Sequence, residues 1–206
     1  MFFLKKLFNK SEQTLPKEQE MKYLIVGLGN IGVEYEKTRH NIGFQVVEYM
    51  AQQAEAQFKS DKLAFRAEIK YKGRILVLIK PTTYMNLSGK SVNYWLQKEK
   101  VELDKLLIIV DDLALPFGSL RIKTKGSDGG HNGLANINQT IGNEYARIRF
   151  GIGDAFSKGK QIDYVLGTWS EAEEKLLPER IEKMSEAVKS FVSIGIERTM
   201  NFFNGK

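Results

Sequence analysis

The 206-residue sequence contains no cysteine and only two histidines, His40 and His131. The absence of cysteine excludes disulfide bonds, thiolate metal sites and a cysteine nucleophile. A two-histidine metal site would need a carboxylate such as Asp128 and a further protein ligand, and no residues here have metal-ligand spacing. We therefore expect no metal and no other cofactor.

Long hydrophobic runs are also missing, so nothing in the sequence is long enough to span a bilayer. Residues 1–10 form a short amphipathic run, too short for a signal peptide and without a cleavage site, and residues 11–20 are polar. We expect a flexible N-terminal extension over residues 1–20, although a membrane-surface or partner helix is an alternative. The domain is predicted to cover residues 21–206. The protein is predicted to be cytoplasmic.

Charge restricts the function only weakly. The net charge of +6 allows a polyanionic partner without requiring one. The 42% hydrophobic content and the length are ordinary for one globular domain with a sizeable core.

The stretch over residues 21–32 combines an apolar, β-branched run with a turn that matches G-x-G-x-x-G. In a dinucleotide-binding fold, the last glycine of this pattern opens a helix. After Gly32 the chain is charged instead, and an apolar helical stripe begins only near Ile42, continuing through Met50 to Phe58. The pattern therefore predicts a turn that carries Asn30 and His40 to the edge of a sheet, and it disfavours a nucleotide-dependent oxidoreductase.

Strand and helix patterns alternate along the rest of the chain. The predicted strands cover residues 65–71, 74–80, 106–110, 119–124 and 147–153, with a short edge strand at 164–166. The predicted helices cover residues 91–98, 132–141 with Asn132 as N-cap, a segment opened by a Ser170–Glu173 capping box, another with Pro178 in its first turn, and a last one from Gly195 to Phe203. This alternation predicts an α/β fold, a single three-layer αβα domain around a mixed, largely parallel twisted sheet.

Four polar residues follow separate buried strands. Asn30 and His40 follow the first, Asn86 the second, and Asp111 the third. Ligands of parallel sheets bind outside the carboxyl ends of the strands. These four side chains therefore define a candidate active site.

His40 beside Asp111 would form a general base and the group that orients it. The alternatives are a surface histidine and a plain turn aspartate. Ser88 lacks the strand-to-helix elbow of a serine nucleophile, so an activated water is the better nucleophile.

Basic residues alternate along two strands and so share faces. They are Arg121, Lys123 and Lys125 on one strand, and Arg147 and Arg149 on the other. Each set is either a solvated strand face or a clamp for nucleic-acid phosphates.

Four motifs together resemble bacterial-type peptidyl-tRNA hydrolase, in order from Met21 to about Asn204. They are Val26–Gly32 with Tyr35 and Thr38–Gly43, Lys80–Gly89, Asp111–Leu113, and Gly129–Gly133. The resemblance implies metal-free hydrolysis of the ester that joins a peptide to tRNA, which returns the tRNA to translation.

The resemblance also implies a role for each site residue. His40 would be the general base, Asp111 its support, and Asn30 would help to select peptidyl groups. The side chains implied to hold the substrate are Tyr35, Tyr84, Met85, Asn86 and Asn132, and an amide of Asn86 or Asn132 would donate to the oxyanion. Lys123 and Arg149 would bind a tRNA phosphate, and the role implied for His131 is to shape the loop that presents Asn132.

The sequence departs from the family pattern at Ile31, where proline is common, and at Tyr84, where phenylalanine is frequent. Neither departure removes a proposed catalytic group. The alternative function is a non-catalytic, splicing-factor-like RNA-binding member of the same fold. The expected partner is peptidyl-tRNA, with a monomeric chain and no membrane.

Overall fold

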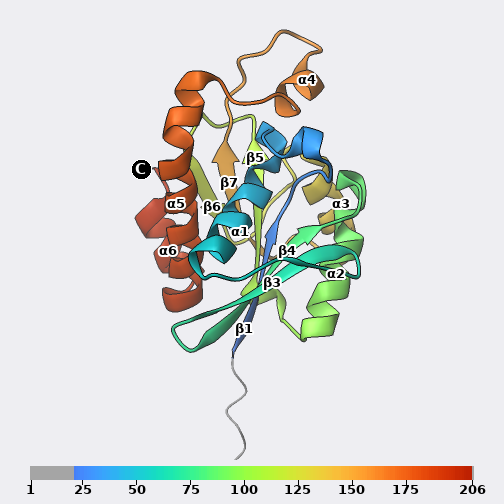
Figure 1. The fold of residues 1–206 in the computed structure, drawn as a ribbon, viewed down its shortest axis with the longest axis vertical. Coiled ribbons are helices and arrows are strands. Elements are labelled where there is room, and N and C mark those ends of the chain that lie inside the picture. The colour runs from blue at the N-terminus through green and yellow to red at the C-terminus, as the bar shows by residue number, and fades with distance from the viewer. Residues whose placement is uncertain (1–20, 206) are drawn as a thin grey trace, which may run out of the picture.

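The computed structural model describes residues 21–205, in which seven strands form one sheet in the order β2-β3-β4-β1-β5-β7-β6 (Figure 1). The strands are β1 (Lys22–Gly27), β2 (Lys59–Asp61), β3 (Ala64–Tyr71), β4 (Arg74–Pro81), β5 (Leu106–Asp112), β6 (Leu120–Lys123) and β7 (Ala146–Gly151). The expected extension over residues 1–20 lies outside the described residues.

The centre of the sheet is parallel. β1 pairs in parallel with β4 and β5, and β5 pairs in parallel with β7. β3 and β6 run antiparallel to their neighbours β4 and β7. Strands buried on both faces are apolar throughout, as in Leu24–Val26 and Leu106–Val110. The predicted mixed, largely parallel sheet is confirmed.

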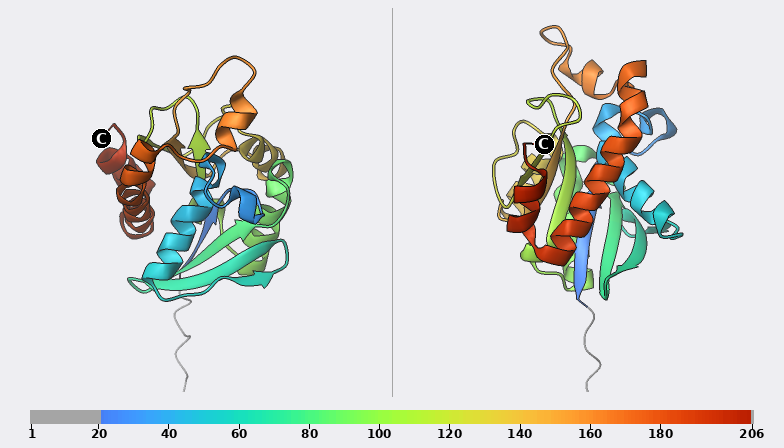
Figure 2. Two further views of the ribbon diagram at one scale, coloured as in Figure 1. Left: turned by 45° about the horizontal axis from the view of Figure 1, so that its top comes forward. Right: turned by 90° about the vertical axis from the view of Figure 1, so that its left-hand side faces the viewer.

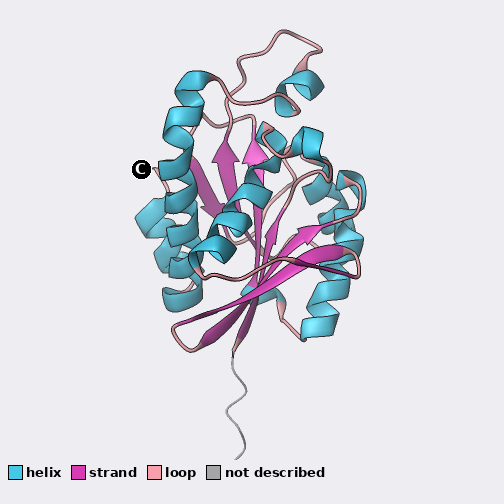
Figure 3. Cartoon of the chain, viewed as in Figure 1, coloured by secondary structure: helices cyan, strands magenta, loops and turns pink. Residues whose placement is uncertain are grey.

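Helices cover both faces of this sheet (Figure 3). α1 (Ile42–Gln53), α5 (Glu171–Ile194) and α6 (Ile196–Phe203) enclose one apolar core. α2 (Ser88–Glu99) and α3 (Asn132–Ile141) enclose the other, in which Trp95 is fully buried. The remaining helices are α4 (Gln161–Val165) and the 3₁₀ turns η1 (Val33–Tyr35), η2 (Arg39–Asn41), η3 (Met85–Leu87) and η4 (Leu103–Lys105). The predicted three layers are therefore present.

Two glycines let α1 lie directly against β1. A Cβ atom on Gly27 would come within 2.1 Å of the carbonyl oxygen of Gly43, and one on Gly43 within 2.5 Å of the backbone of Leu28. α1 begins only at Ile42, as the sequence predicted, so the turn after β1 is followed by η1 and η2 instead of a long helix. The glycine pattern thus serves close packing and the delivery of Asn30 and His40.

Two predicted helix boundaries were wrong. Pro178 does not start a new segment, because α5 runs unbroken through it from Glu171 to Ile194. A proline removes one hydrogen bond of the helix, and burial of the face that carries Met184 and Phe191 offsets that loss. Helix α1 also ends earlier than its apolar stripe predicted. Its last residue is Gln53, and Glu55 adopts a left-handed backbone with φ of 52°.

The expected edge strand over residues 164–166 was wrong as well. These residues belong to α4 and the turn after it, which lie outside the sheet (Figure 2). Tyr164 packs its ring on the guanidinium of Arg39 and donates its hydroxyl to the carbonyl of Ile152. These contacts hold the segment outside the sheet, and a single isolated antiparallel bridge between Thr38 and Thr168 follows it.

The outer edge of β6 is closed by a side chain. The amide of Asn204 donates to the carbonyl oxygen of Ile122 at 3.0 Å and accepts from its N–H at 2.7 Å. Within residues 21–205, no helix is both long and apolar enough to cross a membrane.

We predict that Gly43→Ala destabilises the fold by about 3 kcal/mol or more, since the new methyl group would meet backbone atoms of Leu28, just after β1, and of Ile109 in β5, which cannot move aside. Gln52→Ala, an exposed site on the same helix, is the matched control and should change stability little. Chemical denaturation measures both, and equal stability of the two variants would contradict the packing argument.

We also predict that a chain beginning at Met21 folds and keeps its activity. β1 starts at Lys22, and both of its neighbours in the sheet lie within the described residues. Thermal unfolding and turnover of the shortened chain test this boundary, and precipitation or loss of most activity would show that residues 1–20 belong to the domain.

Candidate active site

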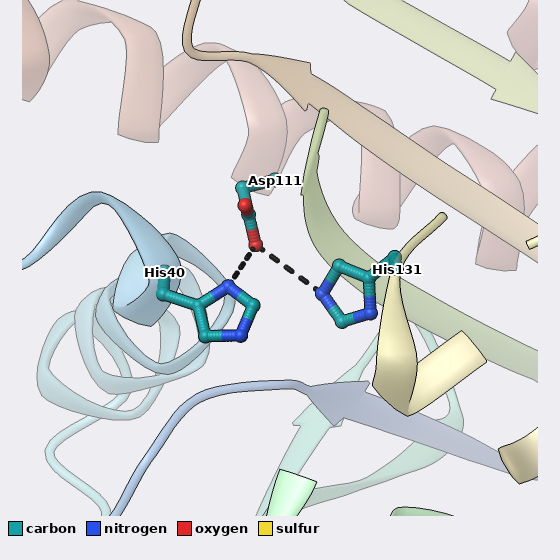
Figure 4. A group of neighbouring side chains, drawn as sticks. All are labelled: His40, Asp111 and His131. Atoms are coloured by element: carbon teal, nitrogen blue, oxygen red, sulfur yellow. Dashed lines mark hydrogen bonds and ion pairs between the residues drawn. The ribbon is translucent and has the colours of Figure 1, made fainter. Parts of the chain in front are cut away.

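The predicted pairing of His40 with Asp111 is present in the structure (Figure 4). Asp111 lies at the end of β5 and is 5% exposed, and His40 lies in η2, after β1. Nδ1 of His40 is 2.8 Å from Oδ1 of Asp111. Because the carboxylate accepts this hydrogen bond, the proton of the neutral ring is on Nδ1, and Nε2 keeps the lone pair of a base.

His131 approaches the same carboxylate oxygen from the other side (Figure 4). Its Nε2 lies 3.3 Å from Oδ1 of Asp111, and the two imidazole rings are 5.0 Å apart. The sequence predicted Asn132 as the N-cap of α3, but His131 is the N-cap. Its Nδ1 accepts from the N–H groups of Gly133 and Leu134, at 3.1 and 3.2 Å. His131 is therefore both a cap and a neighbour of Asp111.

This cap fixes the tautomer of His131. A nitrogen that accepts two hydrogen bonds carries no proton, so the proton of the neutral ring is on Nε2 and faces Asp111. The nitrogens of His40 and His131 and an oxygen of Asp111 lie within 4.8 Å of one another, close enough to consider a metal ion. A metal would need the lone pair of Nε2 and hence a proton on Nδ1, which would break the cap. The donor chemistry therefore disfavours a metal at this position.

The electrostatics match a base with its supporting anion. Burial disfavours the charged form of His40, but attraction to Asp111 and the hydrogen bond that His40 donates to it raise the pKa of His40 above its ordinary 6.5. Burial also opposes ionisation of Asp111, yet the contacts with His40 and His131 hold its pKa well below the ordinary value. Asp111 is thus an anion throughout the neutral range, and His40 is a stronger base than a free imidazole.

Asn30 is held in place by a residue that sequence reasoning did not single out. The side chain of Asn41 accepts from the backbone N–H of Asn30 at 2.8 Å and donates to its carbonyl at 2.9 Å. Asn41 is 2% exposed and follows His40 directly. The backbone of Asn30 is therefore fixed to η2, and its side chain lines a hollow of about 280 Å³ beside Phe44.

The residues expected to hold the substrate lie around the same edge of the sheet, with different degrees of exposure. Met85 is buried in η3, with its sulfur against Gly133 at the start of α3. Tyr84 is 81% exposed, and Asn86 and Asn132 are also exposed. Tyr35 is half-buried in η1. Of this set, only Asn132 lines the cavity that holds His40.

That cavity is small, about 110 Å³. His40 and Asp111 form its inner wall, and Gly129, Gly130 and Ile162 of α4 lie around it. Asp128 points its carboxylate at the N–H of Gly130, so it shapes the glycine-rich loop. The sequence suggested Asp128 as the carboxylate of a possible metal site. The group of possible metal ligands in the structure contains Asp111 instead of Asp128.

The two arginines of β7 do not form a solvated face, and Arg147 does not form a phosphate clamp. Arg147 is fully buried and donates to the carbonyls of Gly126 and Asn143, at 2.9 and 2.7 Å. Arg149 donates to the carboxylate of Asp112 at 3.0 Å and to the carbonyls of residues 127 and 128, and its side chain is 12% exposed. Both arginines thus anchor the loop that leads to His131, whereas Lys123 on β6 is exposed.

Arg39 is a further residue whose role the sequence did not indicate. It pairs with Glu173 at 2.8 Å, donates to the carbonyl of Thr168 at 2.6 Å and lies over the ring of Tyr164. It therefore ties η2, and with it His40, to the segment between α4 and α5. No sequence signal other than its position beside His40 marked it.

Fold and site together are those of a hydrolytic enzyme built on an α/β sheet, with a base-and-carboxylate pair at the carboxyl edge of that sheet. The chain has no cysteine, and Ser88 is not placed to act as a nucleophile. Ser88, the serine considered above, is buried and donates its hydroxyl to the carbonyl of Met85. Water is then the nucleophile that the site can activate.

Comparison with known proteins identifies the family. The family model described as peptidyl-tRNA hydrolase matches residues 24–206. Curated peptidyl-tRNA hydrolases from Cytophaga hutchinsonii and Porphyromonas gingivalis are 55% and 54% identical, over 90% and 89% of this chain and 100% of their own lengths. The crystal structure of peptidyl-tRNA hydrolase from Acinetobacter baumannii superposes with a TM-score of 0.84 at 37% identity, covering 89% of this chain and 94% of the other.

The chain belongs to the peptidyl-tRNA hydrolase family, and it is an enzyme that hydrolyses peptidyl-tRNA. The resemblance stated from the four motifs is confirmed. The non-catalytic RNA-binding alternative is not favoured by this relationship.

We predict that His131→Ala costs about 1 kcal/mol of stability, as loss of an N-cap does, and lowers turnover less than loss of His40. His131→Asn should restore most of that stability, because an asparagine can accept at the N-cap, without restoring the contact with Asp111. Chemical denaturation and turnover separate the two roles, and nitrogen-15 NMR of the ring reports the tautomer. A proton on Nδ1 of His131 would contradict the assignment.

Proposed function

We propose that the chain hydrolyses the ester between the peptide and the 3′ ribose of tRNA with His40 as general base and without a metal. The observation that carries this mechanism is the 2.8 Å bond between Nδ1 of His40 and buried Asp111, which leaves Nε2 unprotonated. A general base needs a lone pair at the operating pH. The hydrogen bond to Asp111 leaves that lone pair on Nε2 of His40, and the same carboxylate raises the pKa of His40.

In this mechanism Nε2 of His40 takes a proton from water as the water oxygen bonds to the ester carbonyl carbon. The imidazolium that forms is stabilised by Asp111. The tetrahedral intermediate collapses by breaking the bond to the ribose oxygen, which receives the proton from His40. The products are the free peptide acid and tRNA, and His40 is again neutral.

The developing oxyanion needs a donor, and the amides of Asn86 and Asn132 are the candidates. Both are exposed at the carboxyl edge of the sheet, and Asn132 also lines the cavity of His40. Asn30 would select peptidyl over aminoacyl groups, with its backbone held by Asn41. Tyr35, Tyr84 and Met85 would complete the walls of the peptide site.

For the tRNA body we propose Lys123 as a phosphate contact, since it is exposed on β6. Arg149 has a more restricted part in this proposal. Its guanidinium is already bonded to Asp112 and to two carbonyls of the loop before His131, so it would reach a phosphate only with its remaining donor capacity. We further propose a monomer that acts in the cytoplasm, where free tRNA is returned to translation from stalled ribosomes.

His40→Ala should lower turnover by about 10²–10⁴-fold while leaving tRNA binding nearly unchanged, because the base acts on water and does not contact the tRNA body. Single-turnover hydrolysis and equilibrium binding measure the two effects. A chelator should change neither. Loss of activity with a chelator, together with equal damage from His131→Ala, would establish a metal site instead.

The rate should rise with pH through the pKa of His40, which lies above 6.5, because only the neutral ring is a base. Asp111→Asn should move this rise to lower pH, since the carboxylate is what raises the pKa, and should also lower the plateau. The pH profile of kcat/KM tests both. An unmoved midpoint would show that Asp111 does not act on His40.

Lys123→Ala should weaken the binding of peptidyl-tRNA and lower the slope of log K against log salt by at most ~1. It should spare a minimal substrate that lacks the tRNA body. Arg149→Ala should lower the hydrolysis of both substrates, because the loop that carries His131 and Asn132 loses its anchor. If Arg149→Ala spares the minimal substrate, the anchoring role is wrong and a phosphate role is favoured.

A further inference from the structure

A groove of about 580 Å³ lies between α1 and α5, on the face of the sheet covered by these helices. Its floor is apolar and includes Trp169, Leu177 and Ile181, and Glu36, Glu48 and Glu174 stand around it. The groove is separate from the cavity of His40, and the proposed reaction uses none of these residues.

The lining is acidic in a chain whose net charge is +6. Lys37 is the single cationic side chain of the lining, against three carboxylates. Glu48 also pairs with Lys80, while Glu36 and Glu174 are exposed at the rim. An occupant of this groove should therefore combine apolar side chains with positive charge.

The chain itself contains a segment of this composition. Residues 1–10 contain five large apolar side chains between Phe2 and Phe8, together with Lys5, Lys6 and Lys10, and no acidic residue. The Cytophaga hutchinsonii relative is matched over all of its length but over 90% of this chain, and the family model starts at residue 24. The segment therefore has no counterpart in that relative, so the shared reaction does not require it.

The geometry of the chain allows the segment to reach the groove. Residues in the first turns of α1 and α5 line the groove. From there α1 runs back toward the start of β1 over a length of about 18 Å (Figure 1). Residues 11–20 can span roughly 33 Å when extended. A tether of this length gives an effective concentration on the order of millimolar, so weak attraction is enough.

We propose that residues 2–10 dock in the groove between α1 and α5 of their own chain, with the apolar side chains on Trp169, Leu177 and Ile181 and the lysines against Glu36 and Glu174.

The test uses the full chain with Asn9→Cys, which a nitroxide label will modify at one position only because the chain has no other cysteine. The two tryptophans serve as probe and control. Trp169 lines the groove, whereas Trp95 is fully buried in the core on the opposite face of the sheet. Docking should broaden the indole N–H resonance of Trp169 strongly and leave that of Trp95 nearly unchanged, and added salt should reduce the difference.

Charge reversal supplies the specificity control. Glu36→Lys combined with Glu174→Lys should remove the selective broadening of Trp169. Glu179→Lys reverses one charge on the far face of α5, where the side chain is 70% exposed, and should leave the broadening intact. Hydrolysis should be unchanged in both variants.

Several results would overturn the proposal. Equal broadening of both tryptophans, or none, would show that the segment does not occupy the groove. Broadening that disappears on dilution would assign the groove to a second copy of the chain. An effect on the label seen only with anionic lipid vesicles would assign the segment to a membrane surface. Insensitivity to both salt and charge reversal would remove the electrostatic basis.

Discussion

One buried carboxylate oxygen organises the site. Oδ1 of Asp111 receives a hydrogen bond from His40 and a longer contact from His131, and these histidines come from segments 91 positions apart in the chain. A carboxylate at this depth is costly to ionise unless donors surround it. The two imidazoles supply those donors, and in return the anion sets the tautomer and basicity of His40. The interior position of β5, between β1 and β7, makes this possible, since loops from both sides converge on its end.

Positive charge in this protein is used inside the fold as well as on its surface. Arg147 and Arg149 hold the loop before His131, and Arg39 holds the segment before α5 against η2. A guanidinium carries five donors in a rigid plane, so one side chain can satisfy several carbonyls of an irregular loop at once. The glycine-rich loop has backbone hydrogen bonds at Gly126 and His131, and the arginines add side-chain donors to its carbonyls. A count of basic residues therefore overstates how much of the surface is available to an RNA.

Much of this architecture could be predicted from the sequence. The apolar runs and the alternation of strand and helix patterns predict the sheet. The rule that ligands bind at the carboxyl ends of parallel strands predicts the pairing of His40 with Asp111. What failed depended on tertiary contacts. The fully buried Arg147 has the same strand pattern as a solvated residue, and the capping nitrogen of His131 cannot be distinguished in sequence from a plain turn residue. The predicted helix start at Pro178 and the predicted strand at Tyr164 failed for the same reason, because burial and packing overrode the local preferences of these residues.

The sheet has two edge strands, β2 and β6, and the way it ends at β6 has a consequence for association. An uncovered outer strand offers a row of N–H and C=O groups to any extended chain, including another molecule of the same protein. The amide of Asn204 presents the same donor and acceptor as a neighbouring strand would, and it occupies the N–H and C=O of Ile122. A peptide that added itself along β6 would first have to displace this side chain and the end of α6. Asn204 and the end of α6 thus oppose fibre-like growth of the sheet at the β6 edge.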